Sequence, residues 1–440
     1  MLPLQTIREQ TERVRSDYRR RGTDAPLDSV LTLDEERRAL LGAVETMRAE
    51  RNRAGKAIGA ARDADERTRL IEEQRAGAAE LDAQEALLRE VEAELERLSF
   101  ELPNILDERV NDGGDDDALV VRESEGAGAP ESTLDTPITR AEAPDPPAVE
   151  PAPPPHWEIG EALGILDFER GVKLSGPHFY VLFGDGARLQ RALITWMLDL
   201  HRSRGYREVY TPFVVREQML YGTGQLPKFA ETMYHDAEDD LWMVPTAEVP
   251  VTNLYRDEIL DADALPIHHC AYTPCFRRER MSAGREVRGL KRGHQFDKVE
   301  LVRFVEPERS GEAHEQLLDD AIAVVRALGL RYRVLRLAAR DTSFASSLTY
   351  DLEVWAPGTR EWLEVSSATN FLDFQARRAS IRYRDADGQV RHLHTLNGSG
   401  LGMPRTLAAL LEQGWRPDGS VELPEVLRPY LGGLTRLPPA

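Results

Sequence analysis

The sequence predicts an α+β protein in which a long helical arm precedes a body built on an antiparallel sheet flanked by helices. Three observations predict this fold. Residues 28–102 repeat apolar side chains every seven positions, residues 113–155 are rich in Pro, Gly and Asp, and strand-like runs alternate with helical ones after residue 156. We therefore expect a helical part at residues 1–112, a linker at 113–155 and the body at 156–440.

The predicted arm has two helices of similar length, separated by polar residues 63–66. Pro103 ends the second helix, because proline cannot continue one. Gln74, Gly77 and Gln84 interrupt its apolar seam, which suits an exposed arm. The pattern is typical of an antiparallel coiled-coil hairpin. The seam residues are Leu33, Leu40, Val44, Met47, Ala54, Ile58 and Ala61 in the first helix and Leu70, Leu81, Leu88, Val91, Leu95, Leu98 and Leu102 in the second.

Charge is uneven along the arm. The first helix carries a basic patch near the predicted tip, whereas the second helix is rich in Glu. Two interpretations are open from the residues alone: ordinary salt bridges between the helices, or contacts with nucleic-acid phosphates. The basic patch consists of Arg48, Arg51, Arg53 and Lys56.

Composition indicates a globular protein of more than one domain. The 440 residues are 41% hydrophobic and 30% charged, and no apolar run is long enough to span a bilayer. The net charge of −20 argues against general affinity for nucleic acid, so any RNA contact must be local. Cysteine is limited to Cys270 and Cys275, which favours a reducing cytoplasm, and we expect no zinc at these residues.

The segment 113–155 begins GGDDD and ends PDPPAVEPAPPP. We expect it to be extended or disordered and partly polyproline II. A spacer is the favoured role, with a proline-rich ligand as the alternative.

A basic loop between two apolar runs is the first candidate site. Residues 271–276 and 299–304 read as strands, and seven cations and Glu279 lie within residues 277–292 between them. In an acidic chain such a loop suits a polyphosphate, and Glu279 suits an adenine amino group. The alternative is a solvated hairpin loop. The cations are Arg277, Arg278, Arg280, Arg285, Arg288, Lys291 and Arg292.

A second candidate site lies near the C-terminus. Glu364 and Ser367 are hard oxygen donors suited to Mg²⁺ that bridges phosphates. Gly398, Gly400 and Gly402 permit close backbone approach to a ligand, and a helical run follows at residues 406–411. Arg405 opens that helix, where a guanidinium can stack on a base or bind phosphate.

Several motifs in register resemble the bacterial-type seryl-tRNA synthetases, which are class II aminoacyl-tRNA synthetases. They are TAEVP at 246–250, FRRE with GREVRGLKRGHQFDKVE within 276–300, EVSS at 364–367, NFLDFQARR at 370–378 and LNGSG with PRT within 396–406. The resemblance implies a cytoplasmic, homodimeric serine–tRNA ligase with a class II catalytic domain. It implies L-serine, ATP with Mg²⁺ and tRNA(Ser) as substrates, with tRNA(Sec) as a second candidate RNA.

The resemblance also implies residue roles. Thr246, Ala247, Glu248, Arg277, Glu300, Asn397 and Ser399 would bind serine. Arg277, Arg278, Glu279, Phe296, Glu364, Val365, Ser366, Ser367 and Arg405 would bind ATP, and Glu364 and Ser367 would hold Mg²⁺ through it. Arg277, Glu279 and Arg405 would be catalytic. The basic patch on the arm would contact tRNA, and residues 188–213, read as a helix and a strand ending at Pro212, would form the dimer interface.

The chain departs from the family pattern at three places. Arg280, Met281 and Ser282 stand where Ala-Gly-Ser is frequent after the glutamate, Ala368 and Thr369 replace a common Cys-Ser, and Leu348 replaces a lysine of some members. The residues argue against two alternative functions. A related ligase that charges a carrier protein would lack the arm, and a scaffold with a decayed body would have lost Arg277, Glu300 or Arg405.

Overall fold

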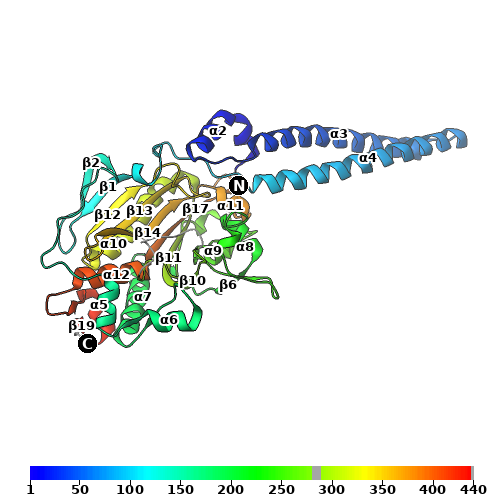
Figure 1. Cartoon of the computed structure of the whole chain (residues 1–440). Helices are drawn as coiled ribbons and strands as arrows, with labels where there is room; N and C mark the ends of the chain where they lie inside the picture. The colour runs from blue at the N-terminus through cyan, green and yellow to red at the C-terminus, as the bar shows by residue number, and fades with distance from the viewer. Residues whose placement is uncertain (280–288, 438–440) are drawn as a thin grey trace. The chain divides into compact units, whose positions relative to one another are not determined.

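The computed structural model describes residues 1–279 and 289–437 (Figure 1). The chain divides into two compact units, one formed by Met1–Arg19 with Thr23–Pro103 and the other by Arg20–Gly22 with Asn104–Ala440. The change from the first unit to the second therefore falls at Pro103, the residue expected to end the arm. Within the described residues, no helix combines the length and the apolar character needed to cross a membrane.

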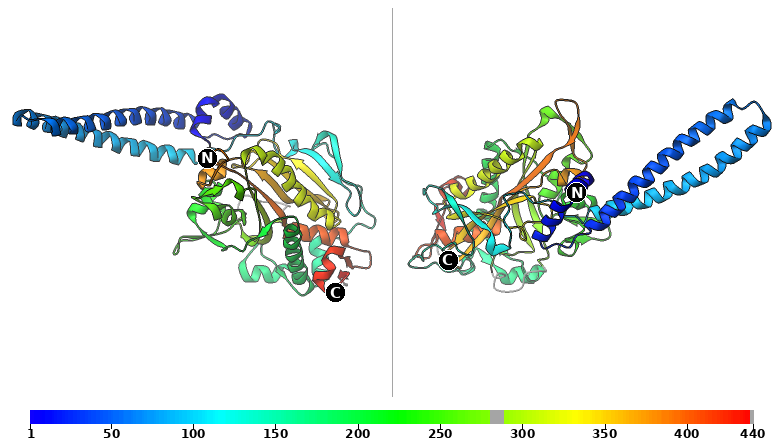
Figure 2. Two further views of the ribbon diagram at one scale, coloured as in Figure 1. Left: turned by 180° about the vertical axis from the view of Figure 1, so that it is seen from behind. Right: turned by 90° about the horizontal axis from the view of Figure 1, so that it is seen from above.

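The first unit is a helical hairpin preceded by two short helices, α1 (Leu4–Glu9) and α2 (Thr11–Arg20). Helices α3 (Leu27–Ala60) and α4 (Ala64–Ser99) run side by side along their length (Figure 2). Asp63 caps α4 by accepting the amide of Glu66 at 3.1 Å. The seam residues Val44, Leu81 and Leu88 form a buried cluster between the helices. The predicted coiled-coil arm is confirmed.

The second unit is built on a nine-stranded sheet in the order β2-β1-β12-β13-β14-β17-β11-β10-β5. Every neighbouring pair is antiparallel except β10 and β5, which are parallel at one edge. The predicted α+β fold is confirmed. The strands are β1 (Leu119–Ser124), β2 (Ser132–Thr139), β5 (Arg207–Glu208), β10 (Ile267–Phe276), β11 (Gln295–Val305), β12 (Tyr332–Arg336), β13 (Leu348–Ala356), β14 (Glu361–Asn370) and β17 (His394–Gly402).

The two faces of this sheet differ. Leu301, Leu363 and Leu396 belong to the main hydrophobic cluster, which also includes residues of the covering helices α7 (Asp185–Ser203), α10 (Ser310–Ala327) and α12 (Met403–Gly414). Successive side chains of a strand point to opposite faces. Glu300 and Asn397, each next to one of these leucines, therefore project from the other face, where the candidate site lies.

Smaller elements surround the large sheet. The short strands are β3 (Leu166–Asp167), β4 (Val181–Leu182), β6 (Val214–Arg216), β7 (His235–Asp236), β8 (Leu241–Met243), β9 (Ile259–Asp261), β15 (Arg382–Arg384), β16 (Val390–His392), β18 (Val421–Glu422) and β19 (Arg436–Leu437). The remaining helices are α5 (His156–Ala162), α6 (Phe168–Ser175), α8 (Glu217–Thr223), α9 (Glu248–Thr252) and α11 (Phe374–Arg378).

Two sequence predictions need correction. The linker expected at residues 113–155 includes β1 and β2, which are extended but are not a free spacer, because β1 pairs with β12 and extends the large sheet. The strand expected at residues 205–213 is limited to β5, which pairs with β10 at His269 and Cys270 only. The predicted strand–loop–strand is confirmed as β10 and β11, while Arg280, Arg285, Arg288, Met281 and Ser282 lie outside the described residues.

Candidate active site

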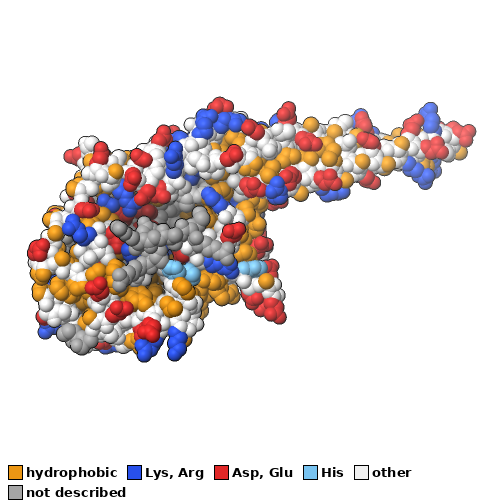
Figure 3. Space-filling model, viewed as in Figure 1, with side chains coloured by type: hydrophobic (Ala, Val, Ile, Leu, Met, Phe, Trp, Pro, Cys, Tyr) orange, Lys and Arg blue, Asp and Glu red, His pale blue; other side chains and the backbone are white. Residues whose placement is uncertain are grey.

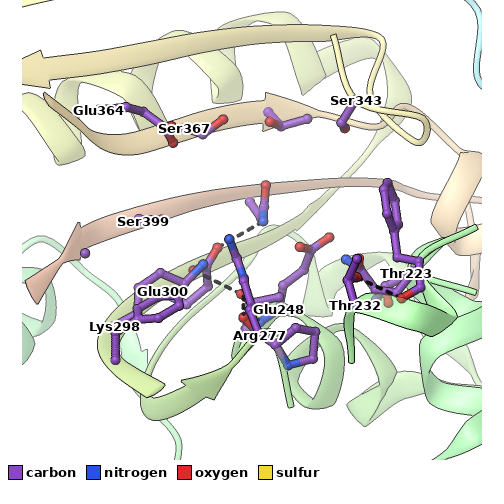
Figure 4. A pocket seen from close by; sticks show the side chains of 18 of the residues that line it. Thr223, Thr232, Glu248, Arg277, Lys298, Glu300, Ser343, Glu364, Ser367 and Ser399 are labelled. Carbon is purple, nitrogen blue, oxygen red and sulfur yellow. Dashed lines mark hydrogen bonds and ion pairs between the residues drawn. The ribbon is translucent and has the colours of Figure 1, made fainter. Parts of the chain in front are cut away.

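A cavity of about 760 Å³ opens on the polar face of the sheet. Strands β11, β14 and β17 contribute its floor, the first residue of α9 and the third of α12 contribute side chains, and the two ends of the β10–β11 loop border it (Figure 4). The two candidate sites predicted from sequence are therefore one site.

One part of the cavity is acidic. The buried carboxylate of Glu300 accepts hydrogen bonds from Asn397 Nδ2 at 2.9 Å and Thr246 Oγ1 at 3.3 Å, and it forms an ion pair with Lys298. Ser399 lies opposite Glu300 in the pairing of β11 with β17. The result is a small polar compartment with a fixed negative charge, suited to a ligand with an ammonium group and a hydroxyl.

Glu248 is a second buried carboxyl in this compartment. Its Oε1 accepts a hydrogen bond from Gln375 Nε2 at 2.6 Å, and the same nitrogen donates to the carbonyl of Thr223 at 3.2 Å. Burial, followed by repulsion from the Glu300 carboxylate, raises the pKa of Glu248 to about 7. A cationic ligand would therefore favour the charged form of Glu248.

Aromatic and guanidinium groups line the adjoining part of the cavity. The Arg277 guanidinium lies 5.2 Å from the ring centre of Phe296, and its Nε donates to the carbonyl of Pro245 at 3.2 Å. Arg405 donates from Nε to the carbonyl of Lys291 at 3.2 Å and from an Nη to Glu364 Oε2 at 3.1 Å. These flat, cationic groups suit a nucleotide base and its phosphates.

Oxygen donors lie beside Arg405. Glu364 and Ser367 line the cavity from β14, and Asp351 is the partner of Ser367 in the pairing of β13 with β14. Among the described residues, Asp351 Oδ1 has no hydrogen-bond partner, and burial raises the pKa of this carboxyl well above its usual range. Carboxylate and hydroxyl oxygens fit Mg²⁺, which takes one or two protein ligands and completes its shell with phosphate oxygens and water.

The C-terminal end of the basic loop is held by a side chain of helix α5, His156. His156 Nε2 accepts the amide of Leu290 at 3.1 Å, and His156 Nδ1 donates to Glu412 Oε1 at 2.8 Å. Gly289 has φ +82°, and a Cβ there would lie 2.3 Å from His156 Nε2. Beyond this anchor, Lys291 pairs with Glu361 at 2.7 Å, so this cation is held at the cavity edge.

Most predicted site residues line the cavity, but three do not. Ala247 is buried in a separate cluster, Ser366 donates to the carbonyl of Ser399 at 2.7 Å, and the Arg278 guanidinium lies 5.1 Å from the ring centre of Tyr234. The cavity brings together Thr246, Glu248, Arg277, Glu279, Phe296, Glu300, Glu364, Val365, Ser367, Asn397, Ser399 and Arg405.

The glycines of β17 serve packing more than ligand approach. A Cβ on Gly398 would lie 3.2 Å from Leu317, and one on Gly400 would lie 2.7 Å from His201 Nε2. These two glycines let helices α10 and α7 lie close to the sheet. Gly402 does line the cavity, so the expectation of close approach to a ligand is retained there alone.

Sequence reasoning missed several functional candidates. Lys298 and Gln375 hold the two buried carboxylates, and His156 holds the basic loop. Gln375 lies between Phe374 and Ala376 in NFLDFQARR, and its buried side-chain amide needs a polar partner. His156 carries no local signal.

The basic patch on the arm divides into two parts. Arg48 forms an ion pair with Glu85 of α4 at 2.9 Å, as the salt-bridge interpretation expected. Arg51, Arg53 and Lys56 are exposed on α3. Both basic and acidic side chains lie at the far end of the hairpin (Figure 3).

Comparisons with known proteins agree with both units. The family model for the seryl-tRNA synthetase N-terminal domain matches residues 1–106, and that for the tRNA synthetase class II core domain (G, H, P, S and T) matches residues 229–414. The chain is 55% identical to a serine–tRNA ligase of Roseiflexus castenholzii, with 98% of each chain covered. It is 53% identical to one of Chloroflexus aurantiacus, with 100% of each covered.

A solved structure shows the same fold. The crystal structure of seryl-tRNA synthetase from Pyrococcus horikoshii complexed with ATP superposes with a TM-score of 0.90 at 31% identity, and 100% of each chain is covered. With full-length relatives above half identity and matching family models at both ends, the chain belongs to the seryl-tRNA synthetase family of class II aminoacyl-tRNA synthetases.

Proposed function

We propose that this protein activates L-serine with ATP to seryl adenylate and transfers serine to the 3′ end of tRNA(Ser). The observation that carries the proposal is the compartment of Glu248, Glu300, Thr246 and Asn397 beside Arg277, Phe296 and Arg405. It offers carboxylates for an ammonium, amide and hydroxyl groups for a serine side chain, and cations for phosphates. The solved relative from Pyrococcus horikoshii was crystallised with ATP, which supports the nucleotide assignment.

In the first step, the serine carboxylate attacks the α-phosphorus of ATP and pyrophosphate leaves. Arg277 binds both the carboxylate and the α-phosphate, and Arg405 stacks on the base opposite Phe296. Glu279 accepts the adenine amino group. Glu364 and Ser367 would hold Mg²⁺, which neutralises phosphate charge. Catalysis then comes from positioning and charge stabilisation, without a protein nucleophile.

In the second step, a ribose hydroxyl at the tRNA 3′ end attacks the adenylate and AMP leaves. The exposed cations Arg51, Arg53 and Lys56 contact the RNA backbone. The test of the function is serine-dependent exchange of pyrophosphate into ATP, followed by charging of total tRNA. Exchange with another amino acid instead of serine would overturn the substrate assignment. A tRNA(Sec) transcript, assayed beside tRNA(Ser), tests the second candidate RNA.

Serine binding is expected to strengthen as pH rises from 6 to 8. Because Glu248 has a pKa of about 7 without ligand, only roughly a tenth of it is charged at pH 6, so the dissociation constant should be about tenfold above its plateau there. Titration calorimetry should also show proton release near pH 6. A flat pH profile would contradict the role of Glu248. In Glu300→Gln the pKa of Glu248, followed in the absence of serine, should fall, since the repulsion from the Glu300 carboxylate is removed.

The Glu248 carboxyl also makes the free energy of unfolding depend on pH. This stability should fall as pH rises, whereas serine binding should strengthen. The carboxyl's folded pKa of about 7 lies above the unfolded value, so its contribution is present at pH 4 and is lost as pH rises through 7. Saturating serine should offset that loss.

We propose that the protein is a homodimer through the region of residues 188–213. The apolar face of α7 is buried within the subunit, at Leu189, Leu193 and Met197. The exposed apolar groups follow it: Tyr210 is 83% exposed and Val214 is 43% exposed, next to the edge strand β5. An edge strand beside exposed apolar side chains is a surface suited to a two-fold interface.

Light scattering at micromolar concentration should therefore give about twice the 49.5 kDa chain mass. We further propose that the arm of one subunit presents tRNA to the active site of the other. Mixing an arm-deleted chain with a Glu364→Ala chain should then restore charging that neither parent shows. An active monomer would contradict the dimer, whereas failed complementation in verified heterodimers would contradict only the cross-subunit binding.

A further inference from the structure

A loop between β12 and β13 forms one wall of the cavity. Ser343, Phe344 and Ala345 line it. In Figure 4, Ser343 lies toward the same end of the cavity as Thr223 and Thr232, while Glu364 and Ser367 lie toward the other. The carbonyl groups of this loop point back into the protein, where they need donors.

The donors come from the two chain segments that border the arm. Arg21, which precedes α3, donates to the carbonyls of Thr342 at 3.1 Å, Ser343 at 2.9 Å and Ser346 at 2.5 Å. Its side chain is buried, with 7% of the residue exposed. A guanidinium presents several donors in a fixed fork, so one side chain fixes three backbone groups.

Asn104, which follows the arm in the chain, donates hydrogen bonds to the same loop. Its Nδ2 donates to the carbonyls of Ala345 at 2.9 Å and Phe371 at 2.8 Å, and its amide donates to the carbonyl of Phe344 at 3.0 Å. Arg21, Asn104 and the loop all belong to the second compact unit, so these contacts lie within one unit.

The loop in turn supports the acidic compartment. A Cβ on Gly224 would lie 3.2 Å from the Cβ of Ala345, so the two residues are in close contact. The preceding Thr223 accepts from Gln375, which also donates to Glu248. By contrast, Arg405 is held by Lys291 and Glu364, outside this chain of contacts.

We infer that Arg21 and Asn104 are positioning residues that hold the wall at Ser343–Ala345 and thereby set the affinity of the compartment of Glu248 for the amino acid. This inference rests on the proposed function for the identity of the amino acid as serine. Arg21 would thus act on the active site through a loop that lies more than 300 positions later in the chain.

The test uses full-length Arg21→Gln, with Arg20→Gln as the matched control. Arg20 is its neighbour, but its guanidinium bonds to Asp112 and to the carbonyl of Val110 instead of the loop. In pyrophosphate exchange, Arg21→Gln should raise the KM for serine by about tenfold, because the wall loses the donor shared by three of its carbonyls, with the KM for ATP within about twofold of wild type. Arg20→Gln should leave both values unchanged, and Arg21→Lys should lie between wild type and Arg21→Gln.

Hydrogen exchange gives a readout that does not depend on the substrate. The amides of residues 342–347 should exchange faster in Arg21→Gln than in the wild type, and those of β11 should not. Unchanged exchange in this loop, or a parallel rise of the two KM values, would overturn the inference. If Arg21→Gln does not fold, Asn104→Ala decides by the same measurements. Absence of serine-dependent exchange by the wild type would instead count against the proposed function, and loop exchange would still decide the inference.

Discussion

Glu300→Ala is expected to abolish serine activation while ATP binding is largely retained. The side chain is buried, and its carboxylate is the acceptor shared by Thr246, Asn397 and Lys298. Without it, Lys298 loses its partner and the compartment loses the fixed charge that faces the amino acid. Serine-dependent pyrophosphate exchange should fall by about 10³-fold or more, because a site built for a polar group discriminates strongly when that group is unpaired. ATP affinity, measured by calorimetry, should change little.

Loss of stability must be separated from loss of the site. Asp320→Asn is the matched control, since Asp320 is also buried and pairs with Arg303 at 2.5 Å, on helix α10 and outside the cavity lining. Both variants should lower the free energy of unfolding, but only the Glu300 variant should lose exchange. Near-normal exchange in a folded Glu300→Ala protein would show that Glu300 does not select serine.

Removal of the arm should separate the two steps of the reaction. A chain lacking residues 30–100, with the gap bridged, is expected to keep serine-dependent exchange and to lose tRNA charging by about 10²-fold or more. The deletion removes the basic side chains that contact RNA phosphates, so tRNA binding weakens. The described residues that line the cavity all belong to the second unit, so adenylation is retained. Exchange and charging on purified tRNA(Ser) measure the two effects. Loss of both in a folded deletion would show that adenylation needs the arm.

Single substitutions refine this result. Arg51→Gln, Arg53→Gln and Lys56→Gln should each lower the log–log salt dependence of tRNA binding by about 0.7 to 0.9, the slope for one phosphate contact. Arg97→Gln on the same hairpin is the control, because Arg97 is held between Glu94 at 2.7 Å and Glu101 at 2.6 Å. An equal effect of Arg97→Gln would mean that net charge, and not the patch, governs binding.

The sequence could predict features that depend on local periodicity. The seam of Val44, Leu81 and Leu88 follows from the seven-residue repeat, and it forms the core of the hairpin. The runs around Cys275 and Val299 have the apolar character of buried strands, and both lie in β10 and β11. The motifs that carry Arg277, Glu300, Glu364 and Arg405 meet in one cavity.

The sequence could not predict features that depend on pairing between distant segments. Strand β2 is mostly exposed and polar, and it is a strand because β1 supplies its partner, which itself pairs with β12 some 200 residues later. The many prolines near β2 predicted a spacer over the whole of residues 113–155. Likewise, nothing local marks Arg21 or His156, because the carbonyls and amides they satisfy belong to loops far along the chain.

By itself, therefore, the sequence determined the helical arm, the order of the motif-bearing strands and the chemical types of groups in the site. The tertiary structure alone decided which of those groups share the cavity, that Ala247, Ser366 and Arg278 do not line it, and that the pKa of Glu248 is about 7. Side-chain type and helix or strand periodicity are local properties of a chain. Burial, charge proximity and hydrogen-bond satisfaction depend on distant segments brought together, so they are set only when the sheet has formed.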